Sequence, residues 1–119
     1  MRTALLLGAS GAVGSHCLQF LLQSPHYEKV TALVRRLLPV EHPKLRQEVV
    51  DFENLEAYAV AIRGQDIFCC LGSTTRKSRD QKEYYKVDFI YPYEIARIGW
   101  RSGAERFSLV SSVNAWARS

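Results

Sequence analysis

Three glycines at intervals of three residues, Gly8, Gly11 and Gly14, form the most informative pattern in this 119-residue chain. They follow a short apolar run, residues 3–7, and they open a segment with helical spacing. Such glycines permit a tight bend after a strand, close approach of a phosphate to the backbone, and close packing of the helix. The unpaired N–H groups of a helix N-terminus also favour an anion. The sequence therefore predicts a phosphate-binding turn, with a glycine turn that binds nothing as the alternative. The residues assigned to the turn are Gly8, Ala9, Ser10, Gly11, Ala12, Val13 and Gly14.

Two adjacent arginines stand where a dinucleotide-binding chain often carries an acidic residue. That acidic residue, about 20 positions beyond the glycines, binds the ribose hydroxyls of NAD. Here the corresponding stretch reads Val34, Arg35 and Arg36, with neither Asp nor Glu. A guanidinium can hold the 2′-phosphate of NADP through bidentate, charge-assisted hydrogen bonds. The sequence favours NADP as cofactor, with NAD as second choice. The alternative is that both arginines simply begin a solvated loop.

Two further strand ends are candidates for cofactor contacts. Asp51 and Phe52 follow the third predicted strand, where Asp51 either accepts a hydrogen bond from the adenine amino group or caps the next helix. Residues that follow the fourth predicted strand are expected to flank the ribose with their backbone. They are Cys70, Leu71, Gly72 and Ser73. Gly72 suits such a close approach, although a plain turn glycine is the competing interpretation.

Strands and helices alternate along the chain. We expect strands at residues 3–7, 29–34, 45–50, 66–71 and 107–111, and helices at residues 12–23, 54–63 and 81–102. In the first helix, the predicted apolar stripe consists of Val13, Cys17, Phe20 and Leu21. Pro92 is expected to kink the last helix. Alternating elements require right-handed crossovers and a sheet covered on both faces. The prediction is one α/β domain over residues 1–119, a doubly wound parallel sheet of the Rossmann type, with about five strands and helices on both faces.

The composition is that of an ordinary globular domain, with 47% hydrophobic and 24% charged residues. The net charge of +4 comes from scattered basic clusters, so we expect no nucleic-acid partner. No segment approaches the ~20 apolar residues that cross a bilayer, so we expect no membrane partner. Cys17, Cys69 and Cys70 lack metal-ligand spacing, and an odd cysteine count without CxxC favours a reducing, cytoplasmic setting. Cys69 and Cys70 should point to opposite faces of their strand.

With these elements assigned, the chain resembles the short-chain dehydrogenase/reductase superfamily, and within it the atypical branch of Tat-interacting-protein-like oxidoreductases. The resemblance covers nearly the whole chain and rests on residues 7–14, 33–36, 70–75, 87–88 and 107–112. It implies an NAD(P)-binding domain that prefers NADP. It also implies a serine after the fifth strand, Ser112 with Ser111 as the alternative, that assists a Tyr-x-x-x-Lys pair in hydride transfer to or from a small-molecule substrate.

The chain departs from that family in one important respect. No tyrosine is followed four residues later by lysine, and the expected sixth and seventh strands and substrate lobe are lacking. We expect either the N-terminal portion of a longer oxidoreductase or a truncated gene. The alternative function is a non-catalytic NADP(H)-binding regulatory or scaffold protein that acts through a protein partner. An uncovered fifth strand would also expose apolar surface, which predicts self-association or a protein partner.

Overall fold

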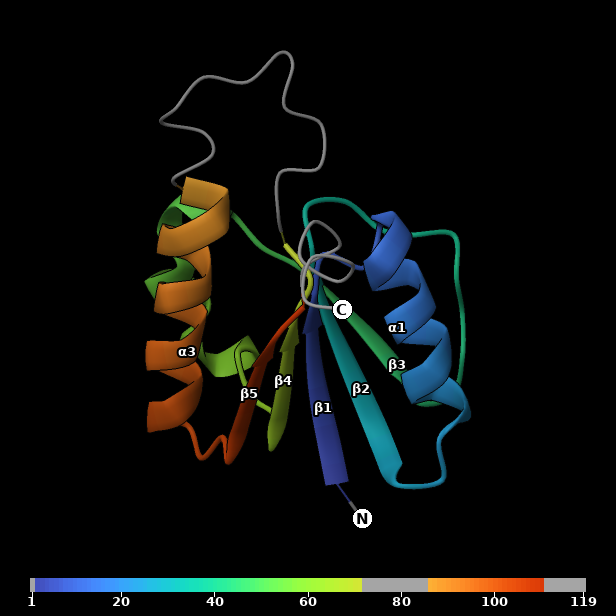
Figure 1. The fold of residues 1–119 in the computed structure, drawn as a ribbon. Coiled ribbons are helices and arrows are strands. Elements are labelled where there is room, and N and C mark those ends of the chain that lie inside the picture. Colours follow the sequence, from blue (N-terminus) through green and yellow to red (C-terminus); the bar gives the residue numbers. More distant parts are fainter. Residues whose placement is uncertain (1, 72–85, 111–119) are drawn as a thin grey trace, which may run out of the picture.

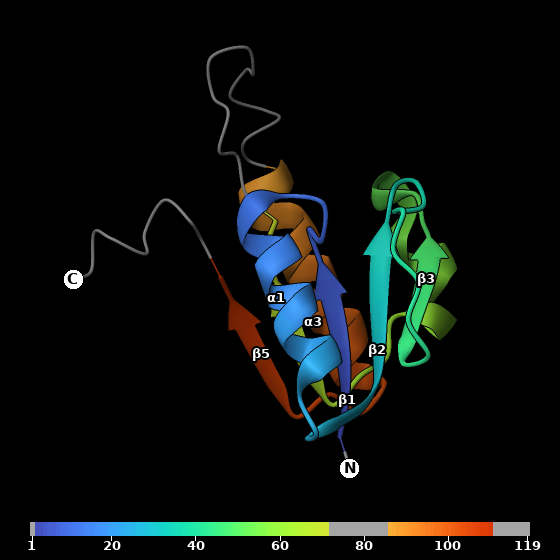
Figure 2. The same ribbon diagram turned by 90° about the vertical axis from the view of Figure 1, so that its right-hand side faces the viewer.

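The computed structural model describes residues 2–71 and 86–110. Within these residues, five strands form one sheet in the order β3-β2-β1-β4-β5, and every neighbouring pair is parallel. The strands are β1 (Arg2–Leu7), β2 (Tyr27–Val34), β3 (Leu45–Val49), β4 (Asp66–Cys69) and β5 (Arg106–Leu109). Figure 2 shows β1, β2 and β3 side by side, with β5 at the opposite edge. The predicted doubly wound parallel sheet is confirmed.

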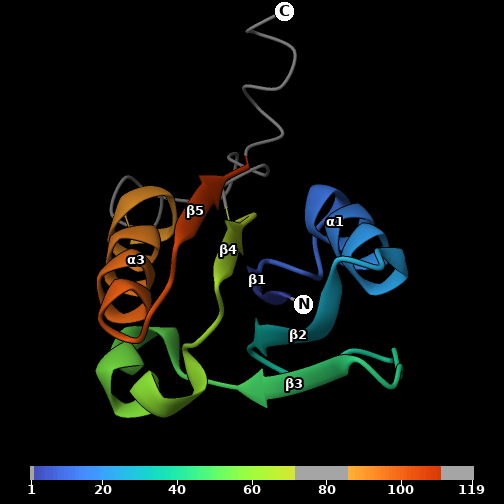
Figure 3. The same ribbon diagram turned by 90° about the horizontal axis from the view of Figure 1, so that it is seen from below.

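Strand β1 is buried on both faces, which explains its continuous apolar run. Leu5 and Leu7 belong to one core cluster, whereas Ala4 and Leu6 belong to a second cluster on the other face of the sheet. Helix α1 (Ala12–Gln23) covers the second cluster, and α3 (Tyr91–Arg101) covers the first. Figure 3 shows these helices on opposite sides of the sheet, as the sequence predicted.

The buried face of α1 differs from the predicted stripe. Gly14, Leu18, Leu21 and Leu22 are buried, whereas Phe20 is 67% exposed. A helix turns about 100° per residue, so residues four, seven and eight positions after Gly14 share its face, and Phe20 points away. Its inclusion in the stripe was wrong.

The segment after β3 is a 3₁₀-type helix, η1 (Phe52–Ala61), and not the predicted α-helix. Asn54 and Tyr58 have non-helical dihedral angles inside it. These breaks divide η1 into short turns. Its buried residues, Phe52 and Leu55, both pack into the cluster beneath α3.

At Pro92, where the sequence predicts a kink, the helix changes type. The described part of this segment consists of a π-helical turn, η2 (Lys86–Ile90), followed directly by α3. Pro92 occupies the first turn of α3, where its missing N–H needs no intrahelical partner. The proline therefore lies where the π-helical turn is followed by the α-helix, and a kink at this position stays a prediction. Residues 81–85 of the predicted helix lie outside the described residues.

Strand β5 is the edge of the described sheet. All four of its residues are exposed, and β4 is the strand that pairs with it. Among the helices described, none has the length and apolar character needed to cross a lipid bilayer.

Candidate functional site

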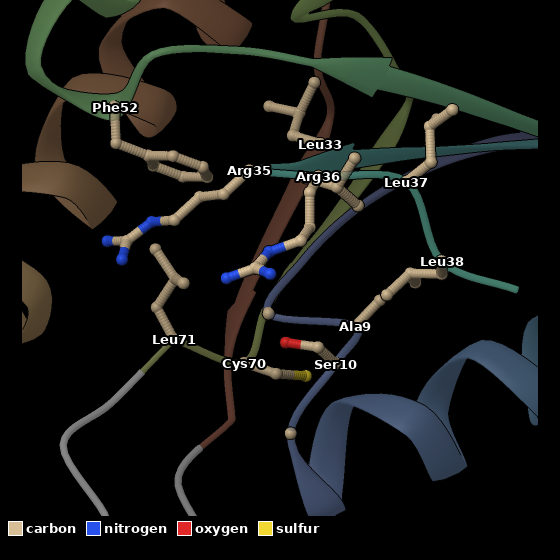
Figure 4. Close-up of a pocket in the computed structure, with 13 residues that line it drawn as sticks. Ala9, Ser10, Leu33, Arg35, Arg36, Leu37, Leu38, Phe52, Cys70 and Leu71 are labelled. Atoms are coloured by element: carbon tan, nitrogen blue, oxygen red, sulfur yellow. The ribbon is translucent and has the colours of Figure 1, made fainter.

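A pocket of about 550 Å³ opens at the carboxyl ends of the central strands (Figure 4). It lies where the strand order changes direction, since β1 is flanked by β2 on one side and by β4 on the other. Ligands of open α/β sheets bind at such a switch point. The pocket is lined by Gly8, Ala9, Ser10, Gly11, Leu33, Val34, Arg35, Arg36, Leu37, Leu38, Phe52, Cys70 and Leu71.

Gly8 begins the turn after β1 and has a backbone that disfavours any side chain. Its φ is +79°, in the left-handed region that glycine adopts without steric cost. A Cβ at Gly8 would also lie 2.7 Å from the carbonyl carbon and oxygen of Cys70. The turn therefore passes directly against the end of β4.

Gly14 and Gly11 differ sharply in how much space surrounds them. A Cβ on Gly14 would lie 1.7 Å from the carbonyl oxygen of Gly8, so α1 can approach the turn only without it. A Cβ on Gly11 would meet no atom closer than 3.7 Å. Packing within the protein therefore does not require glycine at position 11, and the space above it belongs to the pocket.

The N-terminus of α1 begins beside this pocket, whose lining includes the N-cap residue Gly11. The first intrahelical hydrogen bond runs from the Ser15 N–H to the Gly11 carbonyl at 2.8 Å. The N–H groups before Ser15 receive no capping side chain, and the first turn of α1 contains no acidic residue. These donors and the helix dipole create a positive potential that suits a phosphate.

The two arginines extend from the end of β2 into the same space. Figure 4 shows both guanidinium groups directed into the pocket, that of Arg36 on the side where Ser10 lies. The Cζ atom of Arg35 lies 5.4 Å from the centroid of the Phe52 ring, a cation–π contact. Within residues 2–71 and 86–110, neither Arg35 nor Arg36 forms an ion pair. No carboxylate is found among the pocket-lining residues described.

The loop that carries the arginines is anchored by Gln47 of β3. Its side-chain oxygen accepts a hydrogen bond from the Leu38 N–H at 2.7 Å, and its amide group donates to the carbonyls of Leu38 and Val40 at 3.1 Å each. Sequence reasoning missed both this anchor and the lining residues Leu37 and Leu38. Two leucines directly after an arginine pair, in an otherwise polar loop, were the available signal.

Asp51 caps η1, and this is one of the two roles considered for it. Its carboxylate accepts a hydrogen bond from the Glu53 N–H at 2.9 Å. The side chain is exposed and does not line the pocket, although its neighbour Phe52 does. The contact of Asp51 with an adenine amino group stays a prediction.

Cys69 and Cys70 point to opposite faces of the sheet, as predicted. Cys69 is buried in the cluster beneath α3, where burial raises the pKa of its thiol to about 11. Cys70 packs against the cluster beneath α1 and lines the pocket.

The structure therefore brings together residues from four of the predicted segments: the glycine turn, the arginine pair, the end of β3 and the end of β4. Of the predicted contacts, Ala12, Val13, Gly14 and Asp51 do not line the pocket themselves. Four others, Gly72, Ser73, Ser111 and Ser112, lie outside the described residues. The assignment of individual residues to cofactor atoms stays a prediction.

Comparison with known sequences agrees with this geometry. Residues 8–118 match a protein family described as NAD(P)H-binding. The protein HTATIP2 of Rattus norvegicus is 39% identical over 118 residues, which covers 96% of this chain and 48% of that protein. This similarity agrees with the resemblance to the Tat-interacting-protein-like branch. The chain spans about half the length of the curated relatives it matches.

Comparison with solved structures shows the fold. The uronate dehydrogenase from Agrobacterium tumefaciens superposes with a TM-score of 0.77 at 19% identity, covering 94% of this chain and 41% of that one. A short-chain dehydrogenase/reductase superfamily protein from the same organism, with bound NAD, superposes with a TM-score of 0.73 at 18% identity, covering 96% of this chain and 34% of that one. The predicted Rossmann architecture is thus shared with these proteins.

Proposed function

This chain belongs to the NAD(P)H-binding family, and we propose that it selects NADP(H) over NAD(H). In this proposal the pyrophosphate lies over the turn Gly8–Gly14, and the 2′-phosphate binds between Arg35 and Arg36. When bound, the cofactor donates or accepts a hydride, and the role of the chain is to bind and orient the cofactor. The N–H groups at the start of α1 bind the pyrophosphate, and the open space above Gly11 admits it.

The observation that carries the proposal is a pair of arginines in the pocket lining that form no ion pair within the described residues, in a lining without a described carboxylate. Glu53, which lies outside the lining, is the described carboxylate whose pKa is lowered by its hydrogen-bond partners and, in addition, by Arg35. NADP differs from NAD only by its 2′-phosphate, so discrimination between the two cofactors requires groups that bind this phosphate favourably. Two guanidiniums do so, since a hydrogen bond to a charged group contributes about 1.5–3 kcal/mol. A carboxylate in the lining would favour the ribose hydroxyls of NAD instead.

Other predicted contacts complete the proposed site. Asp51 accepts from the adenine amino group, and the backbone after β4, including Gly72 and Ser73, flanks the ribose. Ser112, or Ser111 in the alternative register, holds a substrate carbonyl in the whole protein, whose substrate is a small molecule.

Turnover by these 119 residues alone is not part of the proposal. The sequence contains no tyrosine followed four residues later by lysine. The exposed edge strand β5 favours a second candidate function, in which the chain binds NADP(H) without catalysis and acts through a protein partner or a second copy. NADPH binding combined with NADPH oxidation in the presence of an aldehyde or quinone would instead indicate an enzyme.

The test of cofactor selectivity is the substitution Arg35→Asp. It removes a phosphate ligand and introduces a carboxylate where NAD-binding chains carry one, so NADPH affinity should fall about a hundredfold. NADH affinity should stay the same or rise. Both are measured by titration calorimetry of the purified chain. The substitution Arg36→Gln should lower NADPH affinity by about tenfold.

Arg63→Asp provides the matched control. Arg63 is exposed and lies outside the pocket, so this variant makes the same change in net charge without touching the site. Equal losses for NADPH and NADH in Arg35→Asp would contradict the 2′-phosphate assignment. A comparable loss of NADPH affinity in Arg63→Asp would show that the effect of Arg35→Asp comes from the change in net charge and not from a lost phosphate contact.

A further inference from the structure

Cys17 and Cys70 come from distant parts of the sequence, yet a series of close contacts joins them. The Cys70 N–H donates to the Leu7 carbonyl at 3.0 Å, which places Cys70 beside the end of β1. Gly8 follows Leu7 and is so close that a Cβ would lie 2.7 Å from the Cys70 carbonyl. Backbone contacts with Leu7 and Gly8 therefore hold Cys70 against the glycine turn.

The same turn fixes the position of Cys17. Gly14 approaches the Gly8 carbonyl so closely that a Cβ would lie 1.7 Å from it. Cys17 follows Gly14 by three residues, which is one helical turn, so it lies on the same side of α1. Cys17 and Cys70 both pack against the cluster beneath α1. In Figure 4 the Cys70 sulfur is directed to the side of the pocket where α1 lies.

The two thiols are chemically unequal. Both are free and pack against the same cluster beside the glycine turn. The neighbouring Cys70 thiol lowers the pKa of Cys17, whereas the neighbouring Cys17 sulfur together with burial raises the pKa of Cys70. Cys17 is therefore the thiol that ionises and reacts first. Cys69 is buried on the other face of the sheet and takes no part.

We propose that Cys17 and Cys70 form a reversible dithiol–disulfide couple beneath the dinucleotide pocket, that a hydroperoxide oxidises this couple, and that the disulfide weakens cofactor binding. The Cys17 thiolate attacks hydrogen peroxide, its sulfur becomes a sulfenic acid, and hydroxide leaves and takes up a proton. The Cys70 sulfur then attacks the Cys17 sulfur, the disulfide forms, and a second water leaves with the Cys70 proton. The two sulfurs lose two electrons in total, and the peroxide gains them.

The link to the cofactor follows from the position of the bond and rests on the function proposed above. A disulfide requires a sulfur–sulfur distance of about 2.05 Å, which draws α1 towards the end of β4. The contact between Gly14 and Gly8 leaves no slack to absorb this movement, so the phosphate-binding turn between them must shift. We expect a loss of NADPH affinity of about tenfold, a typical size for coupling between two sites.

Linkage makes the effect reciprocal. Bound NADPH must stabilise the reduced couple by the same factor, which raises the midpoint potential by about 30 mV at saturation. NADPH also covers Cys70 in the pocket lining. Both effects predict that the cofactor slows oxidation.

The first experiment treats the reduced full chain with hydrogen peroxide and maps the product by mass spectrometry. The expected product has lost two hydrogen atoms, retains one of its three thiols, and contains a Cys17–Cys70 cross-link that dithiothreitol reverses. Cys69→Ala is the matched control and should form the same cross-link. This result would assign the cross-link to Cys70 and not to the adjacent Cys69. Cys17→Ser should prevent the cross-link. Its circular dichroism spectrum should match that of the wild type.

Oxygen addition without a cross-link, links between separate chains only, or loss of the cross-link in Cys69→Ala would each overturn the inference. The second experiment compares NADPH titrations of the reduced and oxidised chains, with Cys17→Ser treated identically as control. Equal affinities would remove the regulatory link. If peroxide produces the disulfide but the reduced chain does not bind NADPH, the proposed function fails. If NADPH binds and no disulfide forms, the present inference fails instead.

Discussion

Gly8, Gly11 and Gly14 belong to one motif but have three different structural environments. Gly8 needs its left-handed backbone, and Gly14 needs the space that a Cβ would occupy. Gly11 has an ordinary extended backbone and free space around it. At the scale of single residues, the motif therefore combines two glycines required by the fold with one that packing within the protein does not require.

This difference can be tested with two alanine substitutions. Gly14→Ala should lower the free energy of unfolding by about 2–3 kcal/mol, because its methyl group would collide with the Gly8 carbonyl. Gly11→Ala should lower the free energy of unfolding by less than about 1 kcal/mol, because Gly11 is the N-cap residue of α1 and alanine is only a slightly poorer N-cap. Urea unfolding measures both values.

The binding result should be distinct from the stability result. NADPH titration of Gly11→Ala should show a loss of at least about tenfold, because the methyl group would occupy the space assigned to the pyrophosphate. Full NADPH affinity in Gly11→Ala would show that the phosphates do not pass over this residue.

At the scale of secondary-structure elements, one buried carboxylate joins the amino ends of the strands. Asp66 of β4 accepts two hydrogen bonds from Arg2 of β1, at 2.6 and 3.0 Å, and one from the Tyr27 hydroxyl of β2 at 2.5 Å. The hydrogen bonds from Arg2, followed by that from Tyr27, hold the pKa of Asp66 below its usual value. Burial, with the neighbouring carboxylate, raises the pKa of Tyr27 to about 12. Arg2 also pairs with the exposed Glu105 that precedes β5.

Asp66→Asn should lower the free energy of unfolding by about 2 kcal/mol at neutral pH, because it removes a charged hydrogen-bond acceptor that is nearly fully buried. Since the folded pKa of Asp66 is depressed, its contribution is complete above its unfolded pKa and is lost as the pH falls. The stability gap between wild type and variant should therefore narrow below about pH 4.

Urea unfolding at a series of pH values measures this gap. Glu105→Gln removes the exposed branch of the network and should change stability by less than about 1 kcal/mol. A gap between wild type and Asp66→Asn that stays constant into acid would show that the carboxylate charge does not matter.

At the scale of the whole molecule, one edge carries uncovered apolar side chains. Phe107 and Leu109 of β5 are in register with Ile67 and Cys69, so they lie on the α3 side of the sheet, but both are exposed. Figures 1 and 3 show α3 beside β5, and Trp100 of α3 is 70% exposed. Exposed apolar patches next to an open strand edge favour association.

We therefore expect the chain to self-associate in a concentration-dependent manner in sedimentation velocity. Leu109→Lys should shift the equilibrium towards monomer, because it places a charge on the exposed edge. Val60→Lys is the matched control, since Val60 of η1 is 84% exposed and lies on another element. A monomer at every concentration would contradict self-association. Equal effects of both variants would place the interface elsewhere.

The sequence by itself determined those features that a local pattern encodes. Residues 3–7 form a continuous apolar run because β1 is buried on both faces, and the glycines mark the turn that follows. Alternation of strands and helices then leaves a parallel sheet as the architecture, since each crossover must cover a face. The arginine pair was likewise visible, because it occupies a defined distance from the glycines.

Tertiary structure alone decided the features that depend on contacts between distant segments. The segment predicted as a helix over residues 54–63 is instead of 3₁₀ type and is interrupted at Asn54 and Tyr58, which its local spacing does not show. Gln47 anchors the arginine loop, and Cys17 and Cys70 pack against one cluster, although nothing in the local sequence of these residues indicates it. The physical reason is that hydrogen bonds and thiol chemistry require atoms within a few ångströms, and only the folded chain brings those atoms together.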